Sequence, residues 1–381
     1  MKNILVTGGA GFLGRNLCEK LLQDSNNKII CIDNLVTGSE KNIEEFMANP
    51  NFEFIFHDIT SPLLTPLRIS NAHGNVAIPL INHPILGDLN VQWCNIFCTN
   101  TNTNTNTNTL SNFIPYKDKS FPVGVFKSEK IDEIYHLACI ASPPKYKEFS
   151  LETLNTSFNG TQNVLELARA HGAKVLFTST SEVYGDPLVH PQPEEYFGNV
   201  NTVGERSCYD EGKRVAESLI YEYRRKFNMD IKIVRIFNTY GPYMDIDDGR
   251  VITNFIKQIM ANQPFIIYGD GTQSRSFCYV SDLIDGLYKM MNSEEKGPIN
   301  IGNPNCEFTL NELVGQFEQI TGSKFRVHKI DSTENDPKQR KPIIEKAQRL
   351  LKWEPKIGLE NGLISTMYYF MGGGSNDTYS L

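Results

Sequence analysis

The chain has 381 residues, of which 40% are hydrophobic and 21% are charged, and its formal net charge is −7. This length suits one large or two modest domains with a sizeable core, and the acidic balance argues against nucleic acid as the main partner. No apolar run has the length of a membrane span, and the eight cysteines are scattered rather than arranged as a disulfide framework. We therefore expect a soluble, cytoplasmic protein that does not act at a membrane.

The N-terminal stretch predicts a nucleotide-binding turn. Residues 3–7 form an apolar strand, and a helical pattern follows the turn as far as Leu22. Between them, Gly8, Gly11 and Gly14 permit a tight turn, a close approach of the backbone to a pyrophosphate, and close packing of helix on strand.

The next strand, residues 28–33, ends at Asp33. A carboxylate at this point can accept hydrogen bonds from the adenosine ribose hydroxyls, and it would repel a 2′-phosphate. The pattern therefore predicts NAD, rather than NADP, as the cofactor. A third strand, residues 52–59, ends at Asp58 and Ile59, which we expect near the adenine.

The periodic pattern stops at residue 64 and resumes at residue 130. Residues 64–129 form a low-complexity insert that contains an Asn-Thr repeat, and we expect a solvated loop there. A retained non-coding stretch would have the same composition. The insert also holds two cysteines and two histidines whose spacing fits no common zinc site, so we predict no metal: Cys94, Cys98, His73 and His83.

After the insert, strands alternate with helices, which predicts a doubly wound parallel sheet, the α/β architecture of a Rossmann domain. The expected elements are a strand at 131–139, a loop at 141–146, a helix through 170, a strand at 173–181, a helix at 208–226 and a strand at 230–242. Shorter strands at 264–270 and 298–302, with helices near 252–261, 310–320 and 343–351, indicate a smaller α+β lobe. We predict an NAD-binding Rossmann domain over 1–240, interrupted by the insert, a mainly substrate-binding lobe over 241–369, and a flexible tail over 370–381.

Acid–base chemistry is indicated by Tyr209 and Lys213, which lie four residues apart and share one face of the expected helix. A phenol has an ordinary pKa of about 10, and an ammonium one turn away favours the phenolate and brings it into working range. Thr180, Ser181 and Glu182 stand at the carboxyl end of the preceding strand, where open α/β sheets bind ligands. By itself the Tyr-x-x-x-Lys spacing also fits an ordinary helix surface.

Together, the glycine turn, Asp33 and the Tyr-x-x-x-Lys spacing resemble the extended short-chain dehydrogenase/reductase superfamily of nucleotide-sugar enzymes. Within it, the chain resembles the family of UDP-glucuronic acid decarboxylases, also called UDP-xylose synthases. The matching stretches cover the chain apart from the insert and the tail: HLACIASPPKY, TSTSEVYGDPLVHPQ, ERSCYDEGKR, RIFNTYGPYMDIDDGRVITNF, YGDGTQSRSFCYVSDL, IGNP, DPKQRKP and WEPK. The chain departs from the family at Ile140, Asn155 and Ser157, which puts the affinity for NAD in question more than the chemistry.

The resemblance implies which residues line the site. Those lining NAD are Gly8, Gly11, Phe12, Leu13, Gly14, Asp33, Asn34, Thr37, Gly38, Asp58, Ile59, Leu137, Thr156, Thr178, Tyr209, Lys213, Thr239 and Arg250. Those contacting the nucleotide-sugar are Leu63, Asn163, Tyr223, Asn238, Asn254, Tyr268 and Arg275. Arg340 takes the place of an arginine that faces the substrate carboxylate, and the planar fork of Arg275 suits a pyrophosphate.

The implied reaction is an NAD-dependent decarboxylation of UDP-glucuronate to UDP-xylose and CO2 through a 4-keto sugar. Tyr209 would remove the C4 hydroxyl proton with help from Thr180, while Ser181 and Glu182 position the C6 carboxylate. Alternatives are a decarboxylase that releases the 4-keto pentose, a nucleotide-sugar 4,6-dehydratase and an inactive nucleotide-binding protein. A dehydratase carries Asp-Glu where this chain has Ser181-Glu182, so the acid that expels water is missing. The resemblance also implies a homodimer that pairs through a four-helix contact.

Overall fold

The computed structural model describes residues 1–63, 130–331 and 337–373, and between 64 and 129 it describes the backbone of four short strands alone. These strands pair as two hairpins, β4 (Leu67–Asn71) with β5 (Gly74–Ile78) and β6 (Phe113–Tyr116) with β7 (Lys119–Pro122), so the insert is not wholly the expected loop. The rest of the insert, with its two cysteines and two histidines, lies outside the described residues, as does the predicted tail from residue 374.

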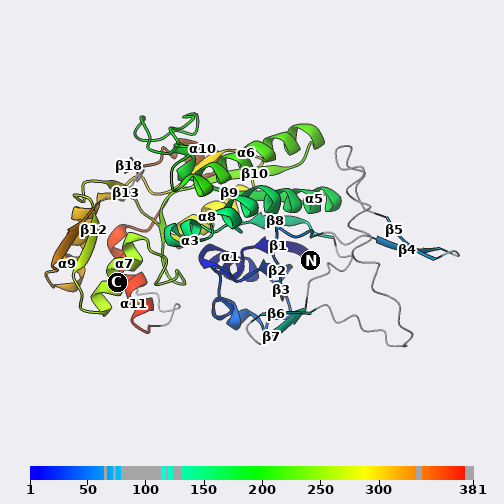
Figure 1. Ribbon diagram of the computed structural model, residues 1–381, viewed down its shortest axis with the longest axis horizontal. Helices are drawn as coiled ribbons and strands as arrows, with labels where there is room; N and C mark the ends of the chain where they lie inside the picture. Colours follow the sequence, from blue (N-terminus) through cyan, green and yellow to red (C-terminus); the bar gives the residue numbers. More distant parts are fainter. Residues whose placement is uncertain are drawn as a thin grey trace.

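Within the described residues, seven parallel strands form the central sheet in the order β15-β10-β9-β8-β1-β2-β3 (Figure 1). They are β1 (Lys2–Thr7), β2 (Asn27–Asp33), β3 (Phe52–Phe56), β8 (Glu133–His136), β9 (Lys174–Thr180), β10 (Ile231–Ile236) and β15 (Ile299–Ile301). The strand order reverses between β1 and β8, whose ends meet where Thr7 pairs with His136. This is the predicted doubly wound α/β fold, and such sheets bind ligands at the carboxyl ends of the strands near the reversal.

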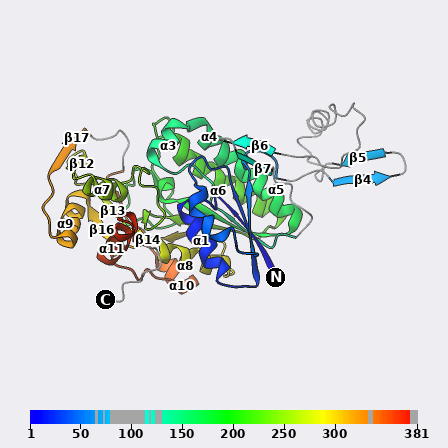
Figure 2. The same ribbon diagram turned by 90° about the horizontal axis from the view of Figure 1, so that it is seen from below.

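Helices cover both faces of the sheet because its strands present apolar side chains alternately to each (Figure 2). Ile4 and Val6 of β1 share one core with buried residues of α1 (Phe12–Leu22), α8 (Val280–Met291) and α10 (Glu345–Leu351). Leu5 shares the opposite core with α5 (Thr161–His171) and α6 (Ser207–Phe227). Before α5, the chain forms α3 (Pro143–Glu148), α4 (Ser150–Asn155) and a π-helical turn (Thr156–Gly160).

A smaller lobe lies at the end of the molecule where the strands of the sheet finish (Figure 1). Its core contains a parallel stack of Phe255 on Phe265, with ring centroids 4.1 Å apart and Phe317 edge-on to both. Its elements are β11 (Thr239–Tyr240), α7 (Val251–Met260), β12 (Phe265–Tyr268), β13 (Ser274–Ser276), β14 (Cys278–Tyr279), β16 (Glu307–Thr309), α9 (Leu310–Thr321), β17 (Val327–Ile330), β18 (Gln339–Arg340) and α11 (Leu359–Phe370). Among the helices of the described residues, none has the length and apolar run that crossing a bilayer requires.

The structure corrects several sequence-based boundaries. The strand expected at 298–302 in the smaller lobe is β15, which pairs with β10 and completes the central sheet. The chain therefore returns to the large sheet after residue 241, and α10 packs there too, against β15 and α8. The expected loop at 141–146 runs into α3, and the strand expected at 230–242 divides into β10 and β11. The sequence reading missed α8 and α11.

Candidate active site

The glycine turn joins β1 to α1 beside the end of β8. Gly8 has a φ of +73°, which L side chains rarely adopt, and a Cβ there would lie 2.8 Å from the Ala138 Cα. A Cβ on Gly14 would lie 2.1 Å from the Gly8 carbonyl oxygen, so α1 packs closely on the turn. Gly11 precedes α1 without a side-chain cap, which leaves the first N–H groups of the helix available to an anion such as a pyrophosphate.

Asp33 ends β2 next to this turn. Its carboxylate accepts hydrogen bonds from the backbone N–H groups of Ala10 (3.0 Å) and Leu35 (2.8 Å). Burial raises the pKa of this carboxyl to about 6, although the hydrogen bonds act to lower it. Because this pKa is still below 7, the group is ionised at neutral pH. Gly38 packs closely on it, since a Cβ on Gly38 would lie 2.9 Å from each carboxylate oxygen. The turn and Asp33 thus fit the pyrophosphate and the ribose of NAD.

Other predicted cofactor residues follow the ends of the neighbouring elements. Asn34 donates a hydrogen bond to Asp58 Oδ2 (3.0 Å), which ties the chain after β2 to the chain after β3. Thr37 is exposed, Leu137 follows β8 and is half-buried, and Thr156 begins the π-helical turn. Asn34, Asp58 and Leu137 therefore lie just beyond the carboxyl ends of β2, β3 and β8.

Lys213 and Tyr209 lie on the buried side of α6. The Lys213 ammonium donates a hydrogen bond to the Thr178 carbonyl oxygen (2.8 Å) and lies 4.7 Å from the centroid of the Phe177 ring. Burial lowers the pKa of Lys213. The Tyr209 ring stacks on Tyr146 of α3, with centroids 5.2 Å apart and planes 7° from parallel, so the phenol is held by packing on a second ring.

The pKa of Tyr209 differs from the expectation. Burial, assisted by Cys139, raises the pKa of Tyr209 above its ordinary value, while a hydrogen bond with Thr180 and the charge of Arg250 lower it. The predicted lowering of this pKa by Lys213 is therefore wrong in direction, because the cost of removing the phenolate from water outweighs the groups that lower the pKa. The protein alone therefore favours the protonated phenol.

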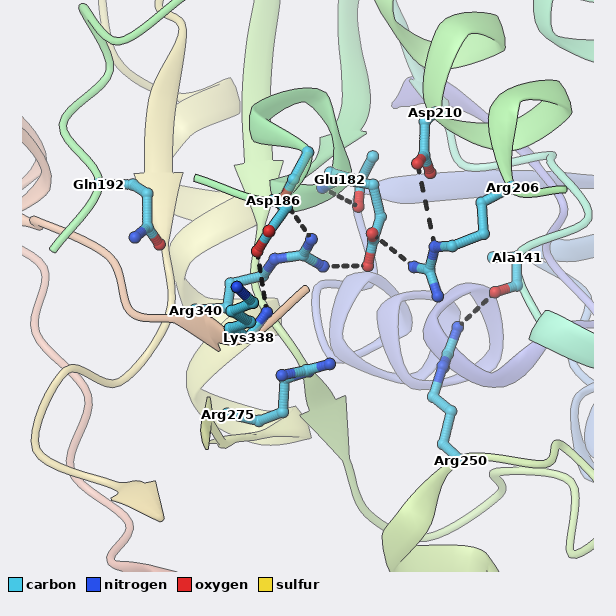
Figure 3. Close-up of polar contacts among 12 residues, drawn as sticks. Ala141, Glu182, Asp186, Gln192, Arg206, Asp210, Arg250, Arg275, Lys338 and Arg340 are labelled. Carbon is cyan, nitrogen blue, oxygen red and sulfur yellow. Dashed lines mark hydrogen bonds and ion pairs between the residues drawn. The ribbon is translucent and has the colours of Figure 1, made fainter. Parts of the chain in front are cut away.

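Glu182 lies between two guanidinium groups (Figure 3). Arg206 Nη2 donates to Glu182 Oε2 (2.6 Å), and Arg340 Nη1 donates to Glu182 Oε1. Burial would raise the pKa of Glu182, but the two arginines outweigh it and hold the pKa well below its usual range. Glu182 is thus a fixed carboxylate. Thr180 is the N-cap of the 3-10 turn Ser181–Tyr184, and its hydroxyl accepts a hydrogen bond from the backbone N–H of Glu182 (3.2 Å).

Arg206 and Asp210 are site candidates that the sequence reading missed. Arg206 precedes α6 and contacts Glu182, and its Nε lies 3.9 Å from Asp210 Oδ2. Asp210 is buried, and burial together with the charge of Glu182 raises its pKa to about 7. Their only signal in the sequence is that both lie within three residues of Tyr209.

A cleft of about 420 Å³ lies between the end of the sheet and the smaller lobe. Arg206, Tyr146 and residues of both lobes line it. The predicted site residues among them are Phe12, Leu13, Thr180, Ser181, Glu182, Tyr209, Asn238, Thr239, Arg250, Asn254, Tyr268 and Arg275. The predicted hydroxyl, phenol and carboxylate therefore share one cleft with three arginines, as a phosphorylated and carboxylated ligand requires.

Most of the predicted cofactor residues do not line this cleft, and neither do five of the predicted catalytic and substrate-binding residues, of which Lys213 has been described above. Arg340 is 1% exposed, lies behind Glu182 and also donates to the Gly185 carbonyl oxygen (3.0 Å). Leu63 is buried in the core on the α5 side of the sheet. The remaining two, which are predicted substrate contacts, make other bonds: the Asn163 amide donates to the Ile59 carbonyl oxygen (2.8 Å), and the Tyr223 hydroxyl donates to Glu166 (2.6 Å).

Comparison with known proteins identifies relatives along nearly the whole chain. The NAD dependent epimerase/dehydratase family matches residues 4–66 and 96–302. UDP-glucuronic acid decarboxylase 5 of Arabidopsis thaliana is 43% identical over 360 residues, which cover 94% of this chain and 86% of that protein. UDP-glucuronic acid decarboxylase 1 of Xenopus tropicalis is 39% identical over 369 residues, which cover 97% of this chain and 72% of the relative.

Solved structures agree with this relationship. The crystal structure of UDP-glucuronic acid 4-epimerase from Bacillus cereus, in complex with UDP-glucuronic acid and NAD, superposes with a TM-score of 0.73 at 26% identity. The superposition covers 97% of this chain and 99% of the epimerase chain.

Proposed function

Because the chain belongs to the NAD-dependent epimerase/dehydratase family, and within it to the UDP-glucuronic acid decarboxylases, we propose that it is an NAD-dependent enzyme that converts UDP-glucuronate to UDP-xylose and CO2. The observation that carries the proposal is the cleft in which Tyr209, Thr180 and Glu182 lie beside three arginines. The large sheet would hold the cofactor, and the smaller lobe would hold the nucleotide end of the substrate through Asn254, Tyr268 and Arg275.

The residues of the cleft suit each step of such a reaction. Bound NAD⁺ would supply the oxidant for the C4 carbon and the reductant for its later return to an alcohol. Tyr209, whose phenolate form would be favoured by the positive charge of bound NAD⁺, would then accept the C4 hydroxyl proton, with the Thr180 hydroxyl on the same oxygen. In the resulting β-keto acid, the electron pair of the C5–C6 bond moves into an enolate as CO2 leaves, and protonated Tyr209 would donate a hydrogen bond to the enolate oxygen. Ser181 and Glu182 would hold the carboxylate end before C5 is protonated.

Incubation with UDP-glucuronate and NAD⁺ tests the proposal. We expect CO2 and UDP-xylose in equal amounts without accumulation of NADH, and no conversion of UDP-glucose. A 4-keto pentose formed together with NADH would identify the releasing type of decarboxylase. Epimerisation without CO2, dehydration of UDP-glucose, or binding without turnover would overturn the proposal.

Asp33 is proposed to select NAD. Asp33→Ala should weaken NAD binding by about 10- to 100-fold, because a hydrogen bond to a charged group contributes about 1.5–3 kcal/mol. NADP binding should change less or improve, because the carboxylate no longer repels the 2′-phosphate, so the preference for NAD narrows. Titration of both cofactors measures this, with Glu53→Ala, an exposed acid of β3, as the charge-matched control. A wild type that prefers NADP would contradict the assignment.

We also propose a homodimer in the cytoplasm. The six cysteines of the described residues are free, which suits a reducing compartment. Leu151, Leu154 and Phe158 are exposed on α4 and the π-helical turn, with Val215 exposed on α6, against which α4 packs. Two such helix pairs from two copies would bury these side chains in a four-helix contact.

The dimer is tested by mass in solution. Sedimentation should give twice the chain mass of 43.1 kDa for the wild type. Leu151→Glu with Phe158→Glu should give a folded monomer, because two charges would be buried at the contact. Val203→Glu, which alters a 90% exposed apolar residue outside these helices, should leave the dimer intact. A wild type that stays monomeric at every concentration would refute the proposed homodimer.

A further inference from the structure

Four ionisable side chains form a row at the cleft, which we term the charge cluster: Asp210, Arg206, Glu182 and Arg340 (Figure 3). Asp210 and Arg340 are buried, whereas the Arg206 and Glu182 side chains are 14% and 15% exposed. Arg206 lies between the two carboxyl groups, 2.6 Å from Glu182 and 3.9 Å from Asp210, and Arg340 contacts Glu182 from the other side. With all four ionised, the two guanidinium groups balance the two carboxylates. The cluster is therefore neutral only while nothing charged enters the cleft.

The substrate of the proposed function, on which this inference rests, brings a further negative charge to the cluster. Glu182 and Arg206 line the cleft, so a C6 carboxylate held there would add a third carboxylate to the two guanidinium groups of the charge cluster. Arg250 and Arg275 also line the cleft, and the charge of Arg275 acts on Glu182, but the proposed function assigns Arg275 to the nucleotide end of the substrate and Arg250 to NAD. An uncompensated charge in a buried site is costly, and protonation of one carboxyl removes it. The question is which carboxyl accepts the proton.

Geometry distinguishes the two carboxyl groups of the protein. Both oxygens of Glu182 accept hydrogen bonds from guanidinium groups, so protonation there would break an ion pair. Asp210 has one long contact with Arg206, and its Oδ1 has no hydrogen-bond partner within the described part of the chain. A proton on Oδ1 therefore breaks no hydrogen bond and weakens only the 3.9 Å ion pair with Arg206.

The other groups that face Asp210 are unsuited to this role. Glu211 of α6 is a third exposed and pairs with Arg214 at 3.5 Å. Burial raises the pKa of both Tyr146, on α3, and Cys208, on α6, so each already carries its proton at neutral pH. Arg340 of β18 stays charged.

We propose that Asp210 balances the charge of the site: it takes up one proton from solvent, on Oδ1, when the substrate carboxylate binds, and returns it after CO2 has left. It is a charge-balancing residue that acts through Arg206, and it does not line the cleft. The proton is exchanged with solvent and adds nothing to the overall reaction, in which one proton per CO2 goes to C5.

Calorimetric titration with UDP-4-deoxy-4-fluoroglucuronate tests this, because that ligand keeps the carboxylate and has no C4 hydroxyl to oxidise. At about pH 8, binding to the NAD-loaded protein in buffers of different ionisation enthalpy should show uptake of most of one proton per site. UDP-xylose, which lacks the carboxylate, should show close to none. Asp210→Asn should bind both ligands and lose the uptake, whereas equal uptake in this variant would assign the proton elsewhere and overturn the inference.

The wild type alone gives a second readout. Above pH 7 the free site loses a proton that the bound site keeps, so affinity for the fluoro ligand should fall as pH rises, by up to ~10-fold per pH unit. Below pH 7 the affinity for the fluoro ligand should not change with pH, and the affinity for UDP-xylose should not change with pH on either side of 7. An enzyme that releases CO2 from UDP-glucuronate but takes up no proton when the fluoro ligand binds would overturn this inference alone. A wild type that neither binds the fluoro ligand nor releases CO2 would overturn the proposed function and this inference with it.

Discussion

Replacing Tyr209 by phenylalanine should lower CO2 release from UDP-glucuronate by about 10²- to 10⁴-fold, because a positioned acid–base group contributes about that much. The variant loses the phenol oxygen and keeps the ring that stacks on Tyr146 at 5.2 Å, so fold and NAD binding should survive. Initial rates of CO2 release and an NAD titration measure the two effects separately.

Tyr223→Phe is the matched control. Tyr223 is on the same helix and is 6% exposed, against 8% for Tyr209, but its hydroxyl donates to Glu166 and lies away from the cleft. It should keep near-normal turnover, although the family resemblance implies that it contacts the substrate. Near-normal turnover of Tyr209→Phe would remove the phenol from the mechanism.

Arg340→Ala should lose most decarboxylation, by about 10²-fold or more, while NAD binding survives. The family resemblance implies that Arg340 faces the substrate carboxylate, but the structure places its guanidinium behind Glu182, outside the cleft lining. We therefore expect it to act by holding Glu182. Breaking a buried ion pair also costs about 3–5 kcal/mol of stability, so thermal unfolding must accompany the rate measurement.

Two further variants separate a positioning role from direct contact. If Arg340 acts through Glu182, then Arg340→Ala combined with Glu182→Gln should lose little more than the single variants. Independent contacts with the substrate would instead make the losses multiply. Lys338→Ala, which alters an exposed lysine two residues away, should be fully active. Full decarboxylation by Arg340→Ala would contradict any role for this residue.

The amino-acid sequence by itself determined the features that depend on near neighbours. The glycine spacing and Asp33 at the strand end predict the turn because backbone sterics act over a few residues. The alternation of strands and helices predicts the doubly wound sheet, and the four-residue spacing places Tyr209 and Lys213 on one helix face. Of the residues that carry these signals, Tyr209 lines the cleft, whereas the three glycines, Asp33 and Lys213 are not part of its lining.

Only the tertiary structure decided which distant groups meet and what burial does to them. Arg340 pairs with Glu182 across 158 residues of sequence, and no local pattern encodes that ion pair. The same is true of the second ion pair of Glu182, with Arg206. β15 belongs to the central sheet because its backbone pairs with β10. The sequence could not predict this, because a short apolar run does not show which strand it pairs with. Burial reversed the expected direction for the pKa of Tyr209, since desolvation depends on everything packed around the phenol, whereas the sequence displays only the lysine one turn away.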